Sequence, residues 1–148
     1  MTTHITQHGP TVAGRRAGYA VAMTVNLVLL FLVNVAPGWQ AVPFLTESTT
    51  EVLLLVNLSM AAAVAANAVY SVFDPAWMRA LGDAVTTSVG LASLVRVWQV
   101  FPFDFDTTSV PWDVVARWVI GLGIFGCVVA IIVALVRLTR ALADVADR

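Results

Sequence analysis

Two arginines inside apolar stretches are the residues of this sequence best suited to bind a ligand. Arg96 and Arg117 each lie about one helical turn from the end of a long apolar segment. A guanidinium group presents a rigid fork of N–H donors that suits a phosphate or a carboxylate. One interpretation is therefore a pocket for an anionic ligand. Three amide side chains toward the same end of the segments belong to this candidate site: Asn34, Asn57 and Gln99.

A structural role explains the same two arginines. Arg117 follows Asp113 by four residues, which is the spacing of an ion pair on one helix face. Arg96 has a side chain long enough to extend toward Asp104 or Asp106 in the following loop. Both interpretations stay open on the sequence alone.

Asp83 is the one acidic residue well inside an apolar segment. Thr87 follows one helical turn later, so the two side chains form a polar stripe on one helix face. A carboxylate at such a depth is able to carry protons or to bind a cation in a transporter or channel. Arg79, four residues before Asp83, offers the alternative of a local ion pair.

The residue inventory argues against most membrane enzymes. The only histidines, His4 and His8, precede the first apolar segment, so two membrane histidines for a haem are missing. Cys127 is the single cysteine, which excludes a Cys-x-x-Cys redox pair, and without lysine no retinal Schiff base forms. No Walker motif or nucleophile elbow is present. We therefore expect no enzymatic activity, no cofactor and no metal site.

Long apolar segments position all of these residues. Of 148 residues, 59% are hydrophobic and 11% are charged, against about 25% charged in a typical soluble domain. So few charges cannot cover a surface that faces water. Four segments are close to or longer than the roughly 20 residues that a helix needs to cross the hydrocarbon. They lack the alternation of apolar and polar residues that is typical of the strands of a membrane barrel.

The predicted fold is an all-α integral membrane protein, a four-transmembrane-helix up-down bundle. Proline-containing pairs such as Pro37-Gly38 and Asp74-Pro75 separate the spans, because proline ends a helix. The predicted spans are residues 17–36, 51–73, 76–101 and 112–138. They belong to a transmembrane domain of residues 15–140, between a flexible polar tail at 1–14 and a short tail at 141–148.

The arginines also predict the orientation of the chain. They lie before the first span, beside the second connection and after the fourth span: Arg15, Arg16, Arg79, Arg137, Arg140 and Arg148. The connections 37–50 and 102–111 contain no basic residue. Because basic segments are retained in the cytoplasm, we expect a multi-pass protein of the cell membrane with both termini cytoplasmic. The two arginine-free connections are rich in aromatic residues and proline. The favoured interpretation is an aromatic belt at the membrane boundary with acidic, solvated tips, and the alternative is a pair of short caps folded over the outer end.

Small residues at four-residue spacing predict the faces through which the helices meet. Lipid-embedded helices associate through small residues and occasional polar side chains, because apolar burial gives no advantage in hydrocarbon. Two ridges have this pattern, and they include Ser59, Ala63 and Asn67 in the second segment and Gly126, Ala130 and Ala134 in the fourth. The asparagines of the first two segments, Asn26, Asn34, Asn57 and Asn67, are expected to form hydrogen bonds between helices.

A dinucleotide-binding interpretation of Gly121-x-Gly123-x-x-Gly126 is rejected, because no strand precedes the motif and it lies within one membrane helix. The leading hypothesis is a non-enzymatic accessory or scaffolding subunit that assembles within the bilayer with itself or with another membrane protein. One alternative is a small oligomeric transporter or channel that uses Asp83 and the Arg96/Arg117 pair. Another is an outer-leaflet lipid- or quinone-binding protein. A net charge of −1 gives no reason to expect a nucleic-acid partner.

Overall fold

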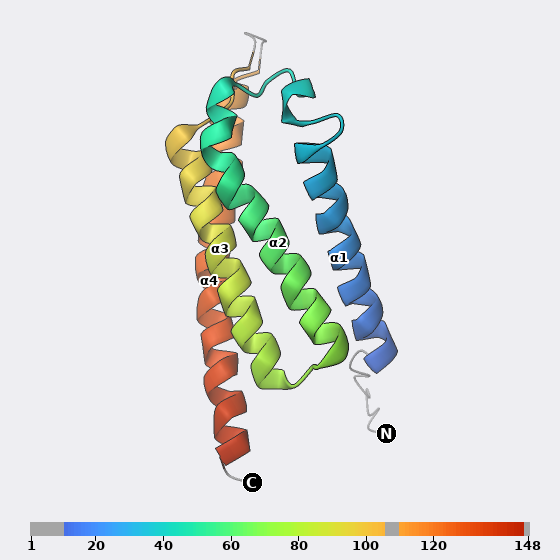
Figure 1. Ribbon diagram of the computed structural model, residues 1–148. Coiled ribbons are helices and arrows are strands. Elements are labelled where there is room, and N and C mark those ends of the chain that lie inside the picture. Colours follow the sequence, from blue (N-terminus) through green and yellow to red (C-terminus); the bar gives the residue numbers. More distant parts are fainter. Residues whose placement is uncertain (1–10, 106–109, 147–148) are drawn as a thin grey trace, which may run out of the picture.

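The computed structural model describes residues 11–105 and 110–146 of the chain (Figure 1). Over this part the chain is all-α, and its four long helices run alternately up and down, as predicted. Each is long and apolar enough to cross a membrane. The long helices are α1 (Val12–Asn34), α2 (Thr50–Val72), α3 (Ala76–Val100) and α4 (Trp112–Ala146), and the 3-10 helices are η1 (Trp39–Ala41) and η2 (Glu47–Thr49).

Local sequence explains where the helices begin and end. The Thr11 hydroxyl accepts a hydrogen bond of 3.2 Å from the Gly14 N–H and so caps α1. Helix α3 starts directly after Pro75 and ends at Phe101, whose left-handed backbone (φ 45°) turns the chain before Pro102. Helix α4 continues beyond residue 138, where the predicted span ends, because the added residues are mostly good helix formers despite their charges.

The helices pack in chain order. Helix α1 lies on α2, α2 lies on α3, and α3 lies on α4, so α1 and α4 form the two flanks of an open row (Figure 1). Few side chains are buried inside this arrangement, and α1 contributes none of them. The buried hydrophobic residues are Val52, Met60, Tyr70, Ala80, Ala84, Ile120 and Ala134. An exterior this apolar suits hydrocarbon rather than water.

The α1–α2 and α3–α4 connections meet at one end of the row, which we call the loop end. Leu45 and Phe103 form an antiparallel bridge. Beside it, the Thr46 N–H donates to the Pro102 carbonyl (3.0 Å) and the Asp104 N–H donates to the Phe44 carbonyl (2.9 Å). Through residue 105, the two arginine-free connections therefore bind each other over the helix ends, and residues 106–109 lie outside the described part.

The opposite end, which we call the terminal end, holds the start of α1, the α2–α3 connection and the end of α4 (Figure 1). Tyr70 of α2 is 5% exposed here and lies against Gly82 of α3. Its hydroxyl donates long, shared hydrogen bonds to the Arg79 carbonyl (3.2 Å) and to Oδ1 of Asp83 (3.3 Å). A Cβ on Gly82 would lie 2.8 Å from Cζ of Tyr70 and closer still to its hydroxyl. The absence of a side chain at Gly82 therefore allows the α2–α3 hairpin to close around Tyr70.

Gly82→Ala is expected to lower the free energy of unfolding by about 1–3 kcal/mol, the usual cost of overpacking. The matched control is Gly90→Ala on the same helix, where no atom lies within 4 Å of an added Cβ. That variant should be neutral or more stable, since alanine favours a helix over glycine by about 1 kcal/mol. Thermal unfolding in one detergent provides the comparison. Equal melting temperatures for the two variants would contradict the close contact between Tyr70 and Gly82.

Candidate functional site

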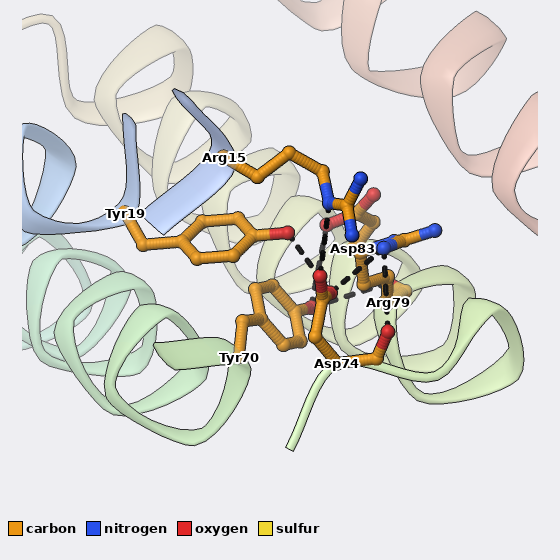
Figure 2. A network of polar contacts seen from close by, with 6 residues as sticks. All are labelled: Arg15, Tyr19, Tyr70, Asp74, Arg79 and Asp83. Atoms are coloured by element: carbon orange, nitrogen blue, oxygen red, sulfur yellow. Dashed lines mark hydrogen bonds and ion pairs between the residues drawn. The ribbon is translucent and has the colours of Figure 1, made fainter. Parts of the chain in front are cut away.

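The densest polar cluster of the described residues surrounds Asp74 in the α2–α3 connection (Figure 2). Its carboxylate accepts from Nε of Arg15 at 3.0 Å, from the Tyr19 hydroxyl at 2.9 Å and from Nη1 of Arg79 at 2.8 Å. Arg15 and Tyr19 belong to α1, and Arg79 belongs to α3. One carboxylate thus joins three parts of the chain at the terminal end.

The electrostatics of this cluster favour an ionised Asp74. Burial acts to raise the pKa of its carboxyl group, but hydrogen bonds from Arg79, Tyr19 and Arg15 outweigh that effect and hold the pKa below its ordinary value of 3.8. The side chain keeps 21% of its surface exposed, so solvent still weakens these ion pairs. The cluster therefore joins α1 to the α2–α3 connection and to the start of α3.

Asp83 lies beside this cluster but has a different partner (Figure 2). It accepts the hydrogen bond of Tyr70, whereas Arg79 pairs with Asp74, so the structure does not form the local Arg79–Asp83 ion pair considered above. Thr87 lies one turn further along α3 and is half-buried. The Asp83 carboxylate is exposed and borders a groove between α3 and α4.

The two arginines of the predicted anion pocket have separate partners at the loop end. Nη2 of Arg96 pairs with Oε2 of Glu51 on α2 at 3.0 Å rather than with Asp104, and the other partner considered, Asp106, lies outside the described residues. The Arg117 guanidinium lies over the ring of Phe101, 4.1 Å from its centroid, and 5.7 Å from that of Trp98. Within the described residues Arg117 has no ion pair, so the pair with Asp113 considered above does not form, and the cation–π contacts stabilise the guanidinium group instead.

Arg117 and Trp98 also line a largely apolar hollow of about 450 Å³ between α3 and α4. Arg96 does not line this hollow, and Gln99 is exposed nearby on α3. The structure therefore does not combine the two guanidinium groups into one pocket.

The asparagines divide into two kinds. Asn34 and Asn57 exchange amide hydrogen bonds of 2.9 and 2.7 Å between α1 and α2, which confirms the expected bond between helices. For Asn26 and Asn67 the expectation is wrong. Each donates to a carbonyl four residues earlier in its own helix, since the helix itself supplies the nearest acceptor.

The predicted small-residue ridges occupy different environments. Ser59, Ala63 and Asn67 are half-buried on α2, which lies between α1 and α3. On α4, Ala134 is 5% exposed, whereas Gly126 and Ala130 are exposed. Among the described residues, a Cβ on Gly126 would meet no atom within 4 Å, so the fold leaves open space beside this glycine.

Sequence reasoning missed the role of Asp74, which was considered only as part of a helix-ending pair. It also missed an apolar cavity of about 470 Å³ at the loop end, with Trp39, Val52 and Phe103 in its wall. Thr49 also lines this cavity; it is 4% exposed, and its Oγ1 has no hydrogen-bond partner. No sequence pattern indicates this cavity, because it forms only when the two connections meet.

Within the described ranges, 11–105 and 110–146, no three His, Cys, Asp or Glu residues lie close enough to hold a metal ion. Comparisons with protein-family models, with curated proteins and with solved structures each found no significant match to this chain. A function must therefore be argued from the residues of the chain itself.

Replacing Asp74 with asparagine is expected to lower the free energy of unfolding by about 2 kcal/mol, because it removes the charge on which two arginines converge. Asp113→Asn is the matched control: it removes one carboxylate that is exposed and has no ion pair within the described residues. Chemical or thermal unfolding of both variants measures the difference. If the two substitutions lower the free energy of unfolding by the same amount, Asp74 does not hold the helices together.

The same cluster predicts how stability depends on pH. Because the folded-state pKa of Asp74 is lowered, its contribution is fully present above the ordinary value of 3.8 and is lost as the pH falls through the folded-state pKa. Melting temperatures measured between about pH 5 and about pH 2 should therefore fall more steeply for the wild type than for Asp74→Asn. Parallel curves would contradict this expectation.

Proposed function

We propose that this chain is a non-enzymatic subunit of the cell membrane that assembles laterally with another membrane protein or with further copies of itself. The carrying observation is the exposed small-residue face of α4, at Gly126 and Ala130, on a helix that packs substantially only against α3. Small residues allow the backbones of two lipid-embedded helices to approach closely.

The partners of the polar residues support a structural role for these side chains. Asp74, Glu51 and the Asn34–Asn57 pair bind groups of the chain itself and so connect neighbouring helices. A binding or catalytic site would be expected to keep such groups available to a ligand. Their mutual pairing instead supports a rigid scaffold that presents its outer helix to a partner.

The transporter alternative has weaker support. Asp83 lies toward the terminal end and Thr87 near the middle of α3, whereas Arg96 lies toward the loop end, about 13.5 Å beyond Thr87 at 1.5 Å per residue. Arg96 is bound to Glu51, and Arg117 lies on aromatic rings. A conducting path would need polar groups between these two ends. The same separation weakens an outer-leaflet anion pocket that depends on both arginines.

Assembly through α4 predicts that the double variant Gly126→Leu/Ala130→Leu associates about tenfold or more weakly than the wild type, because leucine side chains hold the partner helix away. The control is Val128→Leu, which adds bulk to the same helix on the side opposite Gly126, about 200° around the axis. Energy transfer between labelled copies, and between the chain and co-extracted proteins, measures association in vesicles. An unchanged signal for the double variant would contradict assembly through this face.

The proposed orientation places the terminal end in the cytoplasm. A fluorescent protein fused after the last residue should then fold and fluoresce in bacterial cells, since it folds poorly once exported. Alkaline phosphatase inserted into residues 37–50 should be active, since it requires the oxidising exterior. A dark fusion together with an inactive phosphatase would reverse the orientation derived from the arginines.

A further inference from the structure

A charged groove lies between α3 and α4 at the terminal end. Its volume is about 400 Å³. Arg79 and Asp83 of α3 form one side, and Arg137, Arg140 and Asp144 of α4 form the other. Ala76, Ala80 and Ala141 form the rest of its lining, so only small side chains separate the charged groups.

The arginines of α4 in this groove are available to a ligand. Arg137 and Arg140 are exposed, and within the described residues neither has a hydrogen bond or an ion pair. Their spacing of three residues places them on neighbouring positions of one helix face. Arg79 is held at the opposite wall through its bond to Asp74. The two aspartates and three arginines give the lining residues a formal charge of +1, and Asp74 offsets the charge of Arg79 from outside the groove.

An apolar hollow continues from the groove. It has a volume of about 270 Å³ and is lined by Pro75, Trp77 and Val145, and it shares Ala76, Ala141 and Asp144 with the groove. This hollow lies on the terminal side of the groove, whereas the exposed Val129 and Val133 precede Arg137 on the side of the loop end, so the groove marks the boundary between the apolar surface of α4 and its charged end. Tryptophan at such a boundary is typical of the interface between hydrocarbon and head groups.

We propose that this groove binds the phosphate group of an anionic phospholipid, held between Arg137 and Arg140 of α4 and Arg79 of α3. The acyl chains would run from the groove toward the loop end, along exposed apolar side chains of α4 such as Val129 and Val133. One guanidinium group can donate two parallel hydrogen bonds to the oxygens of a phosphate. Basic pockets between transmembrane helices are suited to phospholipid head groups. A phosphodiester carries a single negative charge, and among the described residues Arg137 and Arg140 are two arginines of the groove without an acidic partner. The exposed apolar surface of α4 next to the groove favours a lipid over free inorganic phosphate.

The two aspartates of the groove limit the charge of the ligand that it can bind. Asp83 and Asp144 repel an anion, so a ligand with several negative charges is disfavoured next to them. Replacing one of them also gives a variant whose affinity for the anion should increase. Removing the Asp144 charge leaves all three arginines in place, and the groove then attracts a phosphate more strongly.

Native mass spectrometry of the full chain in a neutral detergent tests this site, with phosphatidylglycerol titrated as the probe. Phosphatidylcholine with the same acyl chains and inorganic phosphate are the comparison ligands. Arg137→Gln and Arg140→Gln should each weaken the binding of phosphatidylglycerol about fivefold, the factor typical of one arginine at a membrane surface. Asp144→Asn should tighten it by a similar factor, a result that a merely unfolded variant does not give.

The matched control is Arg16→Gln, which removes the same charge at the same end of the molecule but on α1, outside the groove. Its affinity for phosphatidylglycerol should equal that of the wild type. An equal loss for Arg16→Gln and Arg140→Gln would overturn the site in favour of general surface attraction. Equal affinity for phosphatidylcholine would overturn it as well. Displacement of the lipid by an equal concentration of inorganic phosphate would show that a soluble ligand is preferred, and would overturn the lipid assignment.

Discussion

Hydrocarbon offers no hydrogen bonds, and for four helices long and apolar enough to cross a membrane this constraint accounts for most of the structure. Every backbone group that crosses a bilayer must be paired within its own segment, which leaves helices as the form for apolar runs of this length. Side-chain charges must likewise be paired or reach the ends of the helices. The chain pairs Arg15 and Arg79 with Asp74 at one end and Arg96 with Glu51 at the other. Between these ends, the buried contacts are made by apolar and small side chains such as Met60, Ala84 and Ala134.

The same constraint explains how an open row of helices is stable. In water, the exposed apolar faces of α1 and α4 would have to be buried, but in lipid they need not be. The helices are therefore connected at a few points: Asp74 joins α1 to the α2–α3 hairpin, the Asn34–Asn57 pair joins α1 to α2, and Tyr70 fits against Gly82. An arrangement with two free flanks is better suited to receive a neighbour than to enclose a substrate, which is why we favour lateral assembly.

The helices and their order could be predicted from the sequence because length, apolar runs and prolines are local signals. The partners of the charged residues could not, because spacing along the chain indicates only local pairs. Arg79 is four residues from Asp83 and yet binds Asp74, and Arg96 bonds with Glu51, which is 45 residues away in the sequence. Arg117 lies over aromatic rings because Phe101 turns back at the end of α3. The ridge on α4 was visible in the sequence, but only the fold shows that Gly126 and Ala130 are exposed.

Lateral assembly is tested most directly on the chain in its own membrane. The membrane is extracted with a polymer that retains the native lipids, and the particles that contain the tagged chain are weighed by native mass spectrometry. We expect the chain in complexes of defined stoichiometry, either with a larger membrane protein or with further copies of itself. Particles that contain a single copy of the chain and only lipid would contradict the proposed role as an assembling subunit.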